Sequence, residues 1–270
     1  MRVAVPQLSR AISVTLSSVL RRAVRAGELT ENPVRRVDKP RIDRRCKVRF
    51  LDQAEESRLR DALKARDEEM QNRRTAANER RQKRHKDLLP RLTHFGDHLT
   101  PAVLLSMNTG LRRGEVLKLR WACVDFDRRL LIVEGRNAKN RQTRHVPLNE
   151  EAMSALRRWR EQSGSGTRFF DVATGFRTAW EKLLKRATIT RFRWHDLRHH
   201  FASRLVQHGV PLNTVRDLLG HSSVAMSLAL CPPGARPTAR GRSQTQRKAA
   251  SCAYPALTVG WLSGGESLPH

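Results

Sequence analysis

Residues 195–200, His-Asp-Leu-Arg-His-His, and residues 218–223, Leu-Leu-Gly-His-Ser-Ser, are the stretches around which this chain is organised. On a helix, His195 and Arg198 leave the same face about one turn apart. An imidazole beside a guanidinium on a rigid element suits a phosphate that must be held while a proton moves. Residues 109–115, Thr-Gly-Leu-Arg-Arg-Gly-Glu, add a second arginine, Arg112. With His221 and Lys139, these groups predict a metal-free phosphoryl-transfer site that still needs a nucleophile.

Composition points to a polyanionic partner. The chain has 270 residues, room for one or two domains, and its 53 Lys and Arg against 26 Asp and Glu give a net charge of +27. So large a charge opposes compaction unless a polyanion neutralises it, and the excess is spread along the chain. Nucleic acid is therefore the expected partner. A solvated basic surface, a basic tail and an anionic membrane are the alternatives.

The cysteine pattern and hydropathy predict an intracellular protein. The four cysteines are far apart and form no CxxC pair, which suggests neither a zinc module nor a disulfide framework. No apolar run reaches the roughly 18 residues needed to span a bilayer. We expect a cytoplasmic protein with no membrane partner.

The N-terminal residues predict the end of a small helical domain, or a helix that packs on something else. Apolar residues recur at helical spacing over 8–26, and Gly27 ends the pattern. We expect residues 1–42 to be the remnant of a helical domain and 43–49 to be a basic linker. The arginines expected to contact DNA here are Arg21, Arg22, Arg25, Arg44 and Arg45.

Residues 50–230 predict a second, mainly α domain with a small β-sheet or hairpin (α+β). Asp52 and Glu55 form a capping-box pattern for a helix to about residue 65. Residues 66–87 are densely charged, which favours a solvated helix or flexible insertion over DNA contact. Helices are expected from about 100 to 109, from near 112, and over 150–162, 172–187, 194–208 and 212–219, with a β-hairpin over 129–148. Residues 231–270 show no periodicity and predict a disordered tail.

Cleaving a phosphodiester without a metal requires fixed positive charge, a proton donor for the departing 5′ oxygen and an in-line nucleophile. Arg112 and Arg198 suit the first role, and Lys139, on the turn of the hairpin, suits the second. His195 and His221 can donate hydrogen bonds or exchange protons.

At these residues the chain resembles the tyrosine recombinase (phage integrase) family. Residues 109–115 resemble the first arginine box of that family, and residues 138–148 its β-hairpin lysine segment. Residues 195–199 resemble its second box, and 218–223 its third. Order and spacing agree over about residues 50–228, and residues 8–42 resemble the end of its helical core-binding domain.

The resemblance implies a fold and a reaction. The family clamps duplex DNA between the two domains, forms a 3′-phosphotyrosyl bond and exchanges strands without cofactor or metal. By position, Arg112 and Arg198 would hold the scissile phosphate, Lys139 would be the general acid, His195 would assist proton transfer and His221 would brace the phosphate. Glu115 would have a supporting role. Arg136, Arg141 and Arg144 are expected to contact DNA, and other recombinase protomers are expected partners. The resemblance also implies a bacterial or phage-derived, nucleoid-associated protein.

Simpler interpretations remain open for several of these residues. Arg112 and Glu115 could form an ordinary surface ion pair, and His195 with His199 could ligate a metal, although no third ligand is evident. The turn also offers Arg136 and Arg141 in place of Lys139. Such turns often contact DNA phosphates without sequence specificity, so Lys139 could make only a contact of that kind.

One departure from the family puts the activity in question. The tyrosine is expected nine residues after His221, where this chain has Leu230, and the one tyrosine present is Tyr254 in the tail. Codons for residues 229–239 can be chosen that, read one base later, encode Arg-Tyr-Ala-His-Leu-Ala-Pro-Asp-Gln-Arg-Leu, with tyrosine in register with Leu230. We therefore hypothesise a frameshift near residue 228, which sequencing the gene would test.

Three functions remain in competition at this point. The chain is a recombinase of a mobile element, with most of its phosphate site intact but unable to cleave alone; or it is a non-catalytic DNA-binding pseudo-recombinase; or a partner's tyrosine completes it in trans. A basic architectural protein unrelated to recombinases is a more distant alternative.

Overall fold

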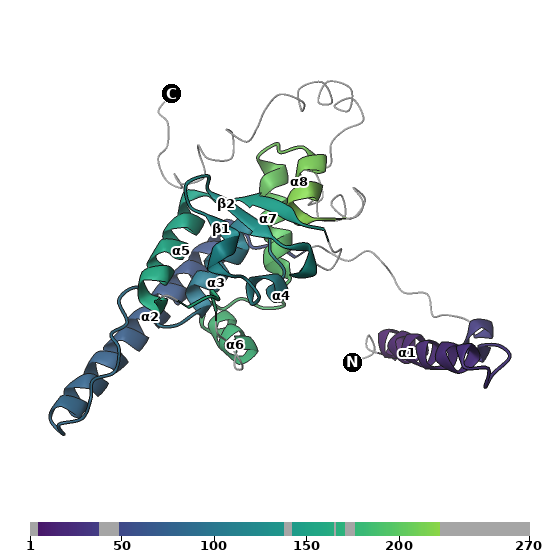
Figure 1. The fold of residues 1–270 in the computed structure, drawn as a ribbon, viewed down its shortest axis with the longest axis horizontal. Coiled ribbons are helices and arrows are strands. Elements are labelled where there is room, and N and C mark those ends of the chain that lie inside the picture. The colour runs from purple at the N-terminus through teal and green to yellow at the C-terminus, as the bar shows by residue number, and fades with distance from the viewer. Residues whose placement is uncertain (1–4, 38–48, 138–141, 165, 171–175, 222–270) are drawn as a thin grey trace. The chain divides into compact units, whose positions relative to one another are not determined.

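The computed structural model describes residues 5–37, 49–137, 142–164, 166–170 and 176–221. The chain divides into two compact units, Met1–Lys47 and Val48–His270, and each is described by itself. Both are drawn in Figure 1.

The first unit contains the helix α1 (Val5–Arg25) and the 3-10 turn η1 (Pro33–Arg36). The buried side chain of Asn32 joins them: it accepts a hydrogen bond from the Val34 amide (3.1 Å) and donates to the Ser17 carbonyl (2.9 Å). The helix predicted over residues 8–26 is confirmed, with an earlier start. Its apolar side chains stay exposed at Ile12, Val14, Leu16 and Val19.

The second unit carries the remaining elements. In chain order they are α2 (Gln53–Gln82), α3 (Leu99–Thr109), α4 (Arg113–Val116), η2 (Trp121–Cys123), β1 (Val124–Asp125), β2 (Leu130–Val133), η3 (Gly135–Asn137), β3 (Arg144–Pro147), α5 (Glu150–Ser163), α6 (Phe176–Arg186), α7 (Asp196–Gln207) and α8 (Leu212–Leu219). The expectation of a mainly helical unit with a small sheet is confirmed.

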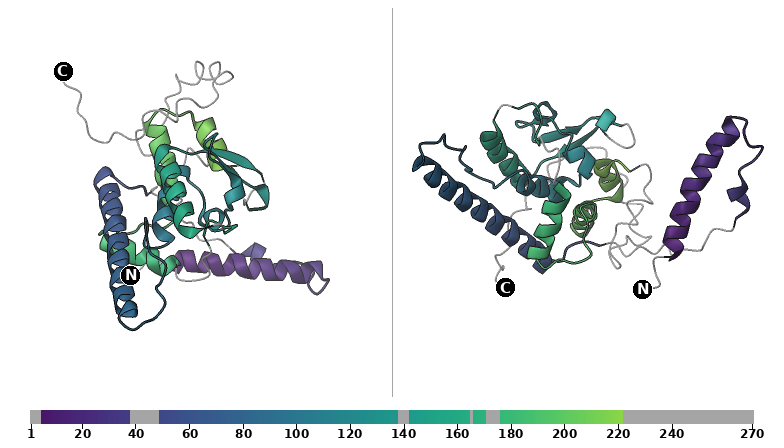
Figure 2. Two further views of the ribbon diagram at one scale, coloured as in Figure 1. Left: turned by 60° about the vertical axis from the view of Figure 1, so that its left-hand side comes forward. Right: turned by 90° about the horizontal axis from the view of Figure 1, so that it is seen from below.

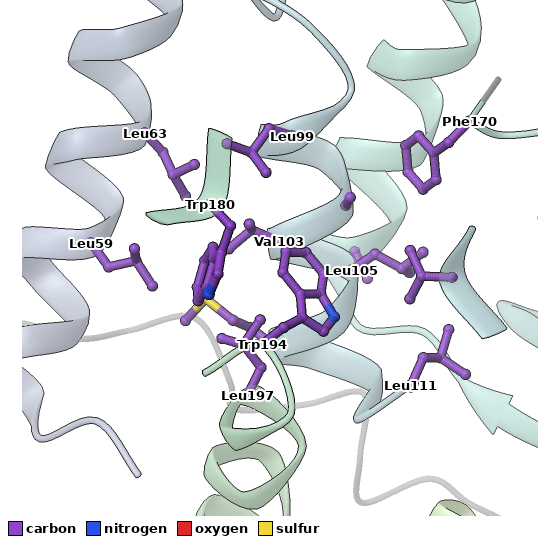
Figure 3. Packing of buried hydrophobic residues seen from close by; sticks show 14 of the residues in the cluster. Leu59, Leu63, Leu99, Val103, Leu105, Leu111, Phe170, Trp180, Trp194 and Leu197 are labelled. Atoms are coloured by element: carbon purple, nitrogen blue, oxygen red, sulfur yellow. The ribbon is translucent and has the colours of Figure 1, made fainter. Parts of the chain in front are cut away.

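The apolar helix α3 is the centre of this unit. Ten of its eleven residues are buried, because α5 and α7 pack against it. Figure 3 shows leucines of α2 and α3 gathered around two tryptophans, Trp180 of α6 and Trp194. Their indole rings make an edge-to-face contact, with centroids 5.0 Å apart. Leu197, at the start of α7, joins the same core and is fully buried, so the helix that carries Arg198 is fixed by core packing.

The sheet is a three-stranded antiparallel meander in the order β1-β2-β3. Leu131 pairs with Val146 and Val133 with Arg144, so alternate residues of each strand face the core. The predicted hairpin is confirmed, and β1 is an edge strand that the sequence did not indicate. The turn between β2 and β3 holds residues 138–141, which lie outside the described residues.

Two predicted helices differ from the structure. The helix from Asp52 has the predicted capping box but runs to Gln82 rather than stopping near residue 65, so residues 66–82 form the solvated helix that was one of the two expectations for that stretch. The helix expected from near residue 112 is only the single turn α4. The helix predicted over 172–187 is present as Phe176–Arg186, and residues 172–175 lie outside the described residues. No helix in the described ranges is long and apolar enough to cross a membrane.

Candidate active site

Arg198 is the centre of the site. It lies in the first turn of α7, is 2% exposed, and is among the largest fully buried side chains. Its Nη1 donates to the Gly110 carbonyl at 2.9 Å, and its Nη2 donates to the Leu219 carbonyl. These two bonds hold the guanidinium between the end of α3 and the end of α8. Three segments far apart in sequence therefore meet at one side chain.

Gly110 makes this close approach feasible. It ends α3 in the left-handed region, with φ +63°. A Cβ atom at this position would lie 2.5 Å from Cδ1 of Phe201 and 2.8 Å from Cδ2 of Leu219. The backbone of the first arginine segment can therefore reach α7 and α8 only because residue 110 has no side chain.

Glu115 organises the other two arginines of the site. Its Oε1 accepts from Nη1 of Arg112 at 2.8 Å, and its Oε2 accepts from the Arg112 amide at 2.9 Å. Nη2 of Arg144 donates to Oε2 at 2.7 Å, while Nε of Arg144 donates to the Leu218 carbonyl at 3.0 Å. Burial would raise the pKa of Glu115, but Arg144 and Arg112 hold that pKa below its usual range. The carboxylate is therefore ionised at neutral pH.

Arg198, in contrast, forms no salt bridge with any carboxylate of the described residues. Burial and the neighbouring positive charge of Arg112 lower the pKa of Arg198 to about 9, so the guanidinium remains charged at neutral pH. The effect of Arg112 on this pKa also shows that the two guanidiniums lie within electrostatic range of each other. A buried cation with no directly bonded carboxylate is costly to maintain, and Glu115 offsets only part of that cost from a distance. The charge at Arg198 is thus suited to a nearby anion.

Three histidines surround this cation. The rings of His195 and His199, one helical turn apart, meet edge to face with centroids 5.0 Å apart. Burial and the charge of Arg198 lower the pKa of His195. Burial and the nearby His195 lower the pKa of His199 to about 4. For His221, burial and the charges of Arg198 and Arg112 lower the pKa to about 4.

The cluster as a whole is cationic. His199 and His221 are neutral at pH 7, and the lowered pKa of His195 favours the same state, so each ring offers one donor and one acceptor. Arg112, Arg144 and Arg198 carry one positive charge each, and Glu115 offsets one of them. A net of two positive charges matches the charge that accumulates on a phosphodiester when a fifth oxygen attacks it.

A network of charged and polar side chains joins α7 to α2 and α5. Nε2 of the buried His200 lies 3.3 Å from Oε2 of Glu56, and Nη1 of Arg204 donates to Oε1 of Glu56 at 2.9 Å. Burial would raise the pKa of Glu56, but His200 and Arg60 lower it to about 2. Arg60 also contacts Glu151 of α5. The start of α2 is therefore tied to the helix that carries Arg198.

The structure brings Arg112, Glu115, His195, Arg198 and His221 together, as the resemblance to the recombinase family implied. Lys139, Arg141, Arg44, Arg45, Leu230 and Tyr254 lie outside the described residues. Arg21, Arg22 and Arg25 belong to α1 in the other unit. Arg136 is exposed and pairs with Glu134 at 2.7 Å.

Arg144 corrects one expectation. We predicted that it contacts DNA, but its side chain is only 7% exposed and its guanidinium is engaged by Glu115 and Leu218. It is an internal brace of the site. The alternation of residues along β3 could have predicted this burial, because Arg144 lies on the same face of the strand as the buried Val146. His199, for which the sequence suggested no role other than a metal ligand, lies beside His195.

Among the residues that the structure describes, no three His, Cys, Asp or Glu side chains are placed to hold a metal ion. His195 and His199 therefore have no described third ligand.

Comparison with curated proteins finds recombinases. The integrase of Salmonella phage P22 is 34% identical over 145 residues, which cover 47% of this chain and 37% of that protein. Tyrosine recombinase XerC of Xanthomonas axonopodis pv. citri is 34% identical over 128 residues, which cover 44% of this chain and 41% of that protein. The chain thus matches less than half the length of these relatives.

Solved structures share the fold. A lambda integrase dimer bound to a COC′ core site matches with a TM-score of 0.59 and 18% identity, covering 86% of this chain and 61% of that one. The Tn1549 transposon integrase in complex with a circular intermediate DNA matches with a TM-score of 0.56 and 20% identity, covering 87% and 77%. The model of the phage integrase family matches residues 50–229, more than half of the sequence. The chain belongs to the phage integrase family.

Proposed function

We propose that this chain acts on duplex DNA as a site-specific recombinase of the tyrosine type, without metal or cofactor. The observation that carries the proposal is the buried guanidinium of Arg198, which two carbonyls hold and no described carboxylate neutralises. A DNA phosphodiester supplies the missing negative charge. The chain's net charge of +27 favours the same partner.

In this proposal the arginines stabilise the transition state. Two N–H groups of Arg198 are bonded to carbonyls, so the guanidinium is oriented before DNA arrives. Arg112 is oriented in the same way by Glu115. Preorganised donors need no rearrangement as charge develops on the phosphate oxygens, and losing one typically lowers a rate by about a hundredfold or more.

The histidines suit proton transfer and hydrogen bonding. The pKa of His221 is about 4, so at neutral pH its ring is an uncharged donor that can brace a phosphate oxygen. His195, whose pKa is also lowered, can exchange a proton with an attacking or departing oxygen. Lys139 is proposed as the general acid that protonates the departing 5′ oxygen.

The nucleophile is the unresolved part of the chemistry. Leu230 stands nine residues after His221, and leucine cannot form a phosphoester. We therefore propose that the chain alone binds DNA but does not cleave it. Other recombinase protomers, one of which could donate a tyrosine, are the proposed protein partners, and a nucleoid-associated cytoplasmic location belongs to the same proposal.

Covalent trapping tests this directly. The chain is incubated with a library of nicked suicide duplexes and resolved under denaturing conditions. We expect no adduct from the chain as it stands and an adduct from Leu230→Tyr, with Leu230→Phe as the matched control. Adding Arg198→Ala to Leu230→Tyr is expected to lower adduct formation by about a hundredfold or more. Equal adduct with and without Arg198 would overturn the proposed site.

The second candidate is a DNA-binding protein without chemistry, and Leu230 is the residue that favours it. Salt-sensitive binding to duplex DNA with no adduct from Leu230→Tyr would support it. A mixture of the unaltered chain with the double variant Leu230→Tyr, Arg198→Ala tests whether a partner protomer donates the tyrosine. Neither protein has both Arg198 and a tyrosine at position 230, so an adduct would require complementation between protomers.

A further inference from the structure

The C-terminal half of α2 and the segment that follows it form a projecting arm, here called the basic arm and defined as residues 70–93. Figure 1 shows this half of α2 extending away from the rest of its unit, and the right-hand view of Figure 2 shows a chain segment returning alongside it. The buried residues of α2 end at Asp67, so the arm does not contribute to the core. By the rise of an α-helix, its helical part is about 20 Å long.

Hydrogen bonds and an ion pair fix the base of the arm to the rest of the unit. Oδ1 of Asp67 accepts from the Gly96 amide at 2.9 Å, and Arg66 forms a two-pronged ion pair with Asp97. The backbone of Gly96 passes so close to α2 that an added Cβ would lie 2.7 Å from Sδ of Met70. These contacts fix the point at which the arm leaves the core.

The returning segment is also pinned along its length. Nδ2 of Asn78 donates to the Leu89 carbonyl at 2.9 Å, and Oδ1 of Asn78 accepts from the Leu89 amide at 2.8 Å. Arg74 donates to the Pro90 carbonyl at 2.6 Å, and Arg81 to the Asp87 carbonyl at 2.5 Å. The segment interpreted from sequence as solvated or flexible is therefore preorganised, which reduces the entropy lost when a partner binds.

The arm carries eight basic and two acidic residues. The exposed basic residues are Arg73, Arg80, Lys83, Arg84, Lys86 and Arg91. Arg73 and Arg80 are seven residues apart, almost two full turns, and so lie on one face of the helix. Among the described residues, Arg73 with Glu69 is the single salt bridge made by a basic residue of the arm. Concentrated like charges destabilise a compact state unless a polyanion offsets them.

The arm cannot reach the phosphate held at Arg198. Glu56, near the start of α2, contacts His200 of α7, and the end of α2 at Gln82 lies about 40 Å farther along the helix axis. That distance is slightly more than one helical turn of duplex DNA. Duplex DNA carries one negative charge per roughly 1.7 Å, so the arm can lie along more phosphates than it has cations.

We propose that the basic arm is a second DNA-binding element, which grips duplex DNA about one helical turn from the phosphate held at Arg198. This inference rests on the proposed DNA-binding function. The arm supplies affinity through phosphate contacts and reads no bases, because contacts of lysine and arginine with the phosphate backbone carry no sequence information.

The test compares four proteins on random-sequence duplexes of about 12 and 40 base pairs, with dissociation constants measured by anisotropy across a salt series. The proteins are the unaltered chain, an arm triple (Arg80→Gln, Arg84→Gln, Lys86→Gln), a control triple on other exposed surfaces (Arg128→Gln, Arg157→Gln, Lys182→Gln) and Arg198→Met. Each triple removes the same charge. Circular dichroism should show the same helix content in all four.

On the long duplex the arm triple should lose about tenfold or more in affinity, and its slope of log Kd against log salt should fall by about 2–3. The control triple should change that slope by less than about 1. The proposal that the arm binds DNA would be wrong if both triples lost the same affinity, or if the arm triple bound as tightly as the unaltered chain. If Arg198→Met were the one variant that lost binding, the arm would not be a DNA-binding element, whereas the proposed phosphate site at Arg198 would be supported. If the unaltered chain bound neither duplex, both ideas would fail.

Discussion

Arg144 and Glu115 form a two-pronged ion pair inside the unit, with Nη2 to Oε2 at 2.7 Å and Nη1 to Oε1 at 3.2 Å. Their side chains are 7% and 2% exposed. The same carboxylate holds Arg112, and the same guanidinium reaches the Leu218 carbonyl. One buried pair therefore connects the sheet with α4 and α8, the elements next to Arg112 and the Leu219 carbonyl that holds Arg198.

Breaking this pair should unfold the protein more easily. Glu115→Gln leaves the buried cation of Arg144 without its counter-ion, and we expect the free energy of unfolding to fall by about 3–5 kcal/mol. Urea denaturation followed by circular dichroism measures it. The double variant Glu115→Leu with Arg144→Met removes both charges and should recover much of that loss. A single variant as stable as the unaltered chain would show that the pair contributes little.

Substitution of Arg198 should affect stability less than substitution of Glu115. No described carboxylate contacts its buried charge, so removal of that charge in Arg198→Met should offset the loss of its two hydrogen bonds and change the melting temperature little. The same substitution should abolish adduct formation in a Leu230→Tyr background. Differential scanning calorimetry beside the trapping assay measures both. A variant that is strongly destabilised would mean that Arg198 is structural and that its charge is not held ready for an anion.

Local patterns in the sequence predicted much of this fold. The capping box at Asp52 and Glu55 marked the start of α2, and strand alternation gave the hairpin. The family motifs also identified Arg112, Arg198 and His221 as neighbours. Each of these features depends on residues a few positions apart, or on a motif that is read as a unit.

Tertiary partners account for what the sequence did not predict. Charge alone made Arg144 look like a DNA contact, because nothing near it in sequence reveals that Glu115 and Leu218 lie against it. Apolar spacing predicted a longer helix after Arg112. There the chain tightens instead, with the Leu119 amide bonded to the Val116 carbonyl three residues back. The end of α2 was also missed, because the returning segment that supports it contacts Asn78 from eleven residues away.

Acid should destabilise the site through its histidines. His199 and His221 have pKa values of about 4 in the folded protein against 6.5 for the free side chain, so the unfolded chain binds more protons between these values. The free energy of unfolding should therefore fall as pH drops from about 6.5 to about 4, by up to about 1.4 kcal/mol per pH unit for each histidine. His199→Gln should flatten this dependence, whereas His145→Gln, on the exposed side of β3, should not. Urea titrations at half-unit pH steps measure it, and identical slopes for both variants would contradict the assignment.

Gly110 offers a matched pair of substitutions. Gly110→Ala places a methyl group 2.5 Å from Phe201 and 2.8 Å from Leu219 at a φ of +63°, so steric overlap adds to backbone strain. Gly209, which follows α7 at a φ of +76°, has nothing within 4 Å of an added Cβ, so Gly209→Ala reports the strain alone. We expect about 1 kcal/mol of destabilisation from Gly209→Ala and about 2–4 kcal/mol from Gly110→Ala. Gly110→Ala should also lower adduct formation in the Leu230→Tyr background, because the Gly110 carbonyl anchors Nη1 of Arg198. Equal effects of the two substitutions on stability and on adduct would show that the approach of this loop to α7 and α8 does not position the arginine.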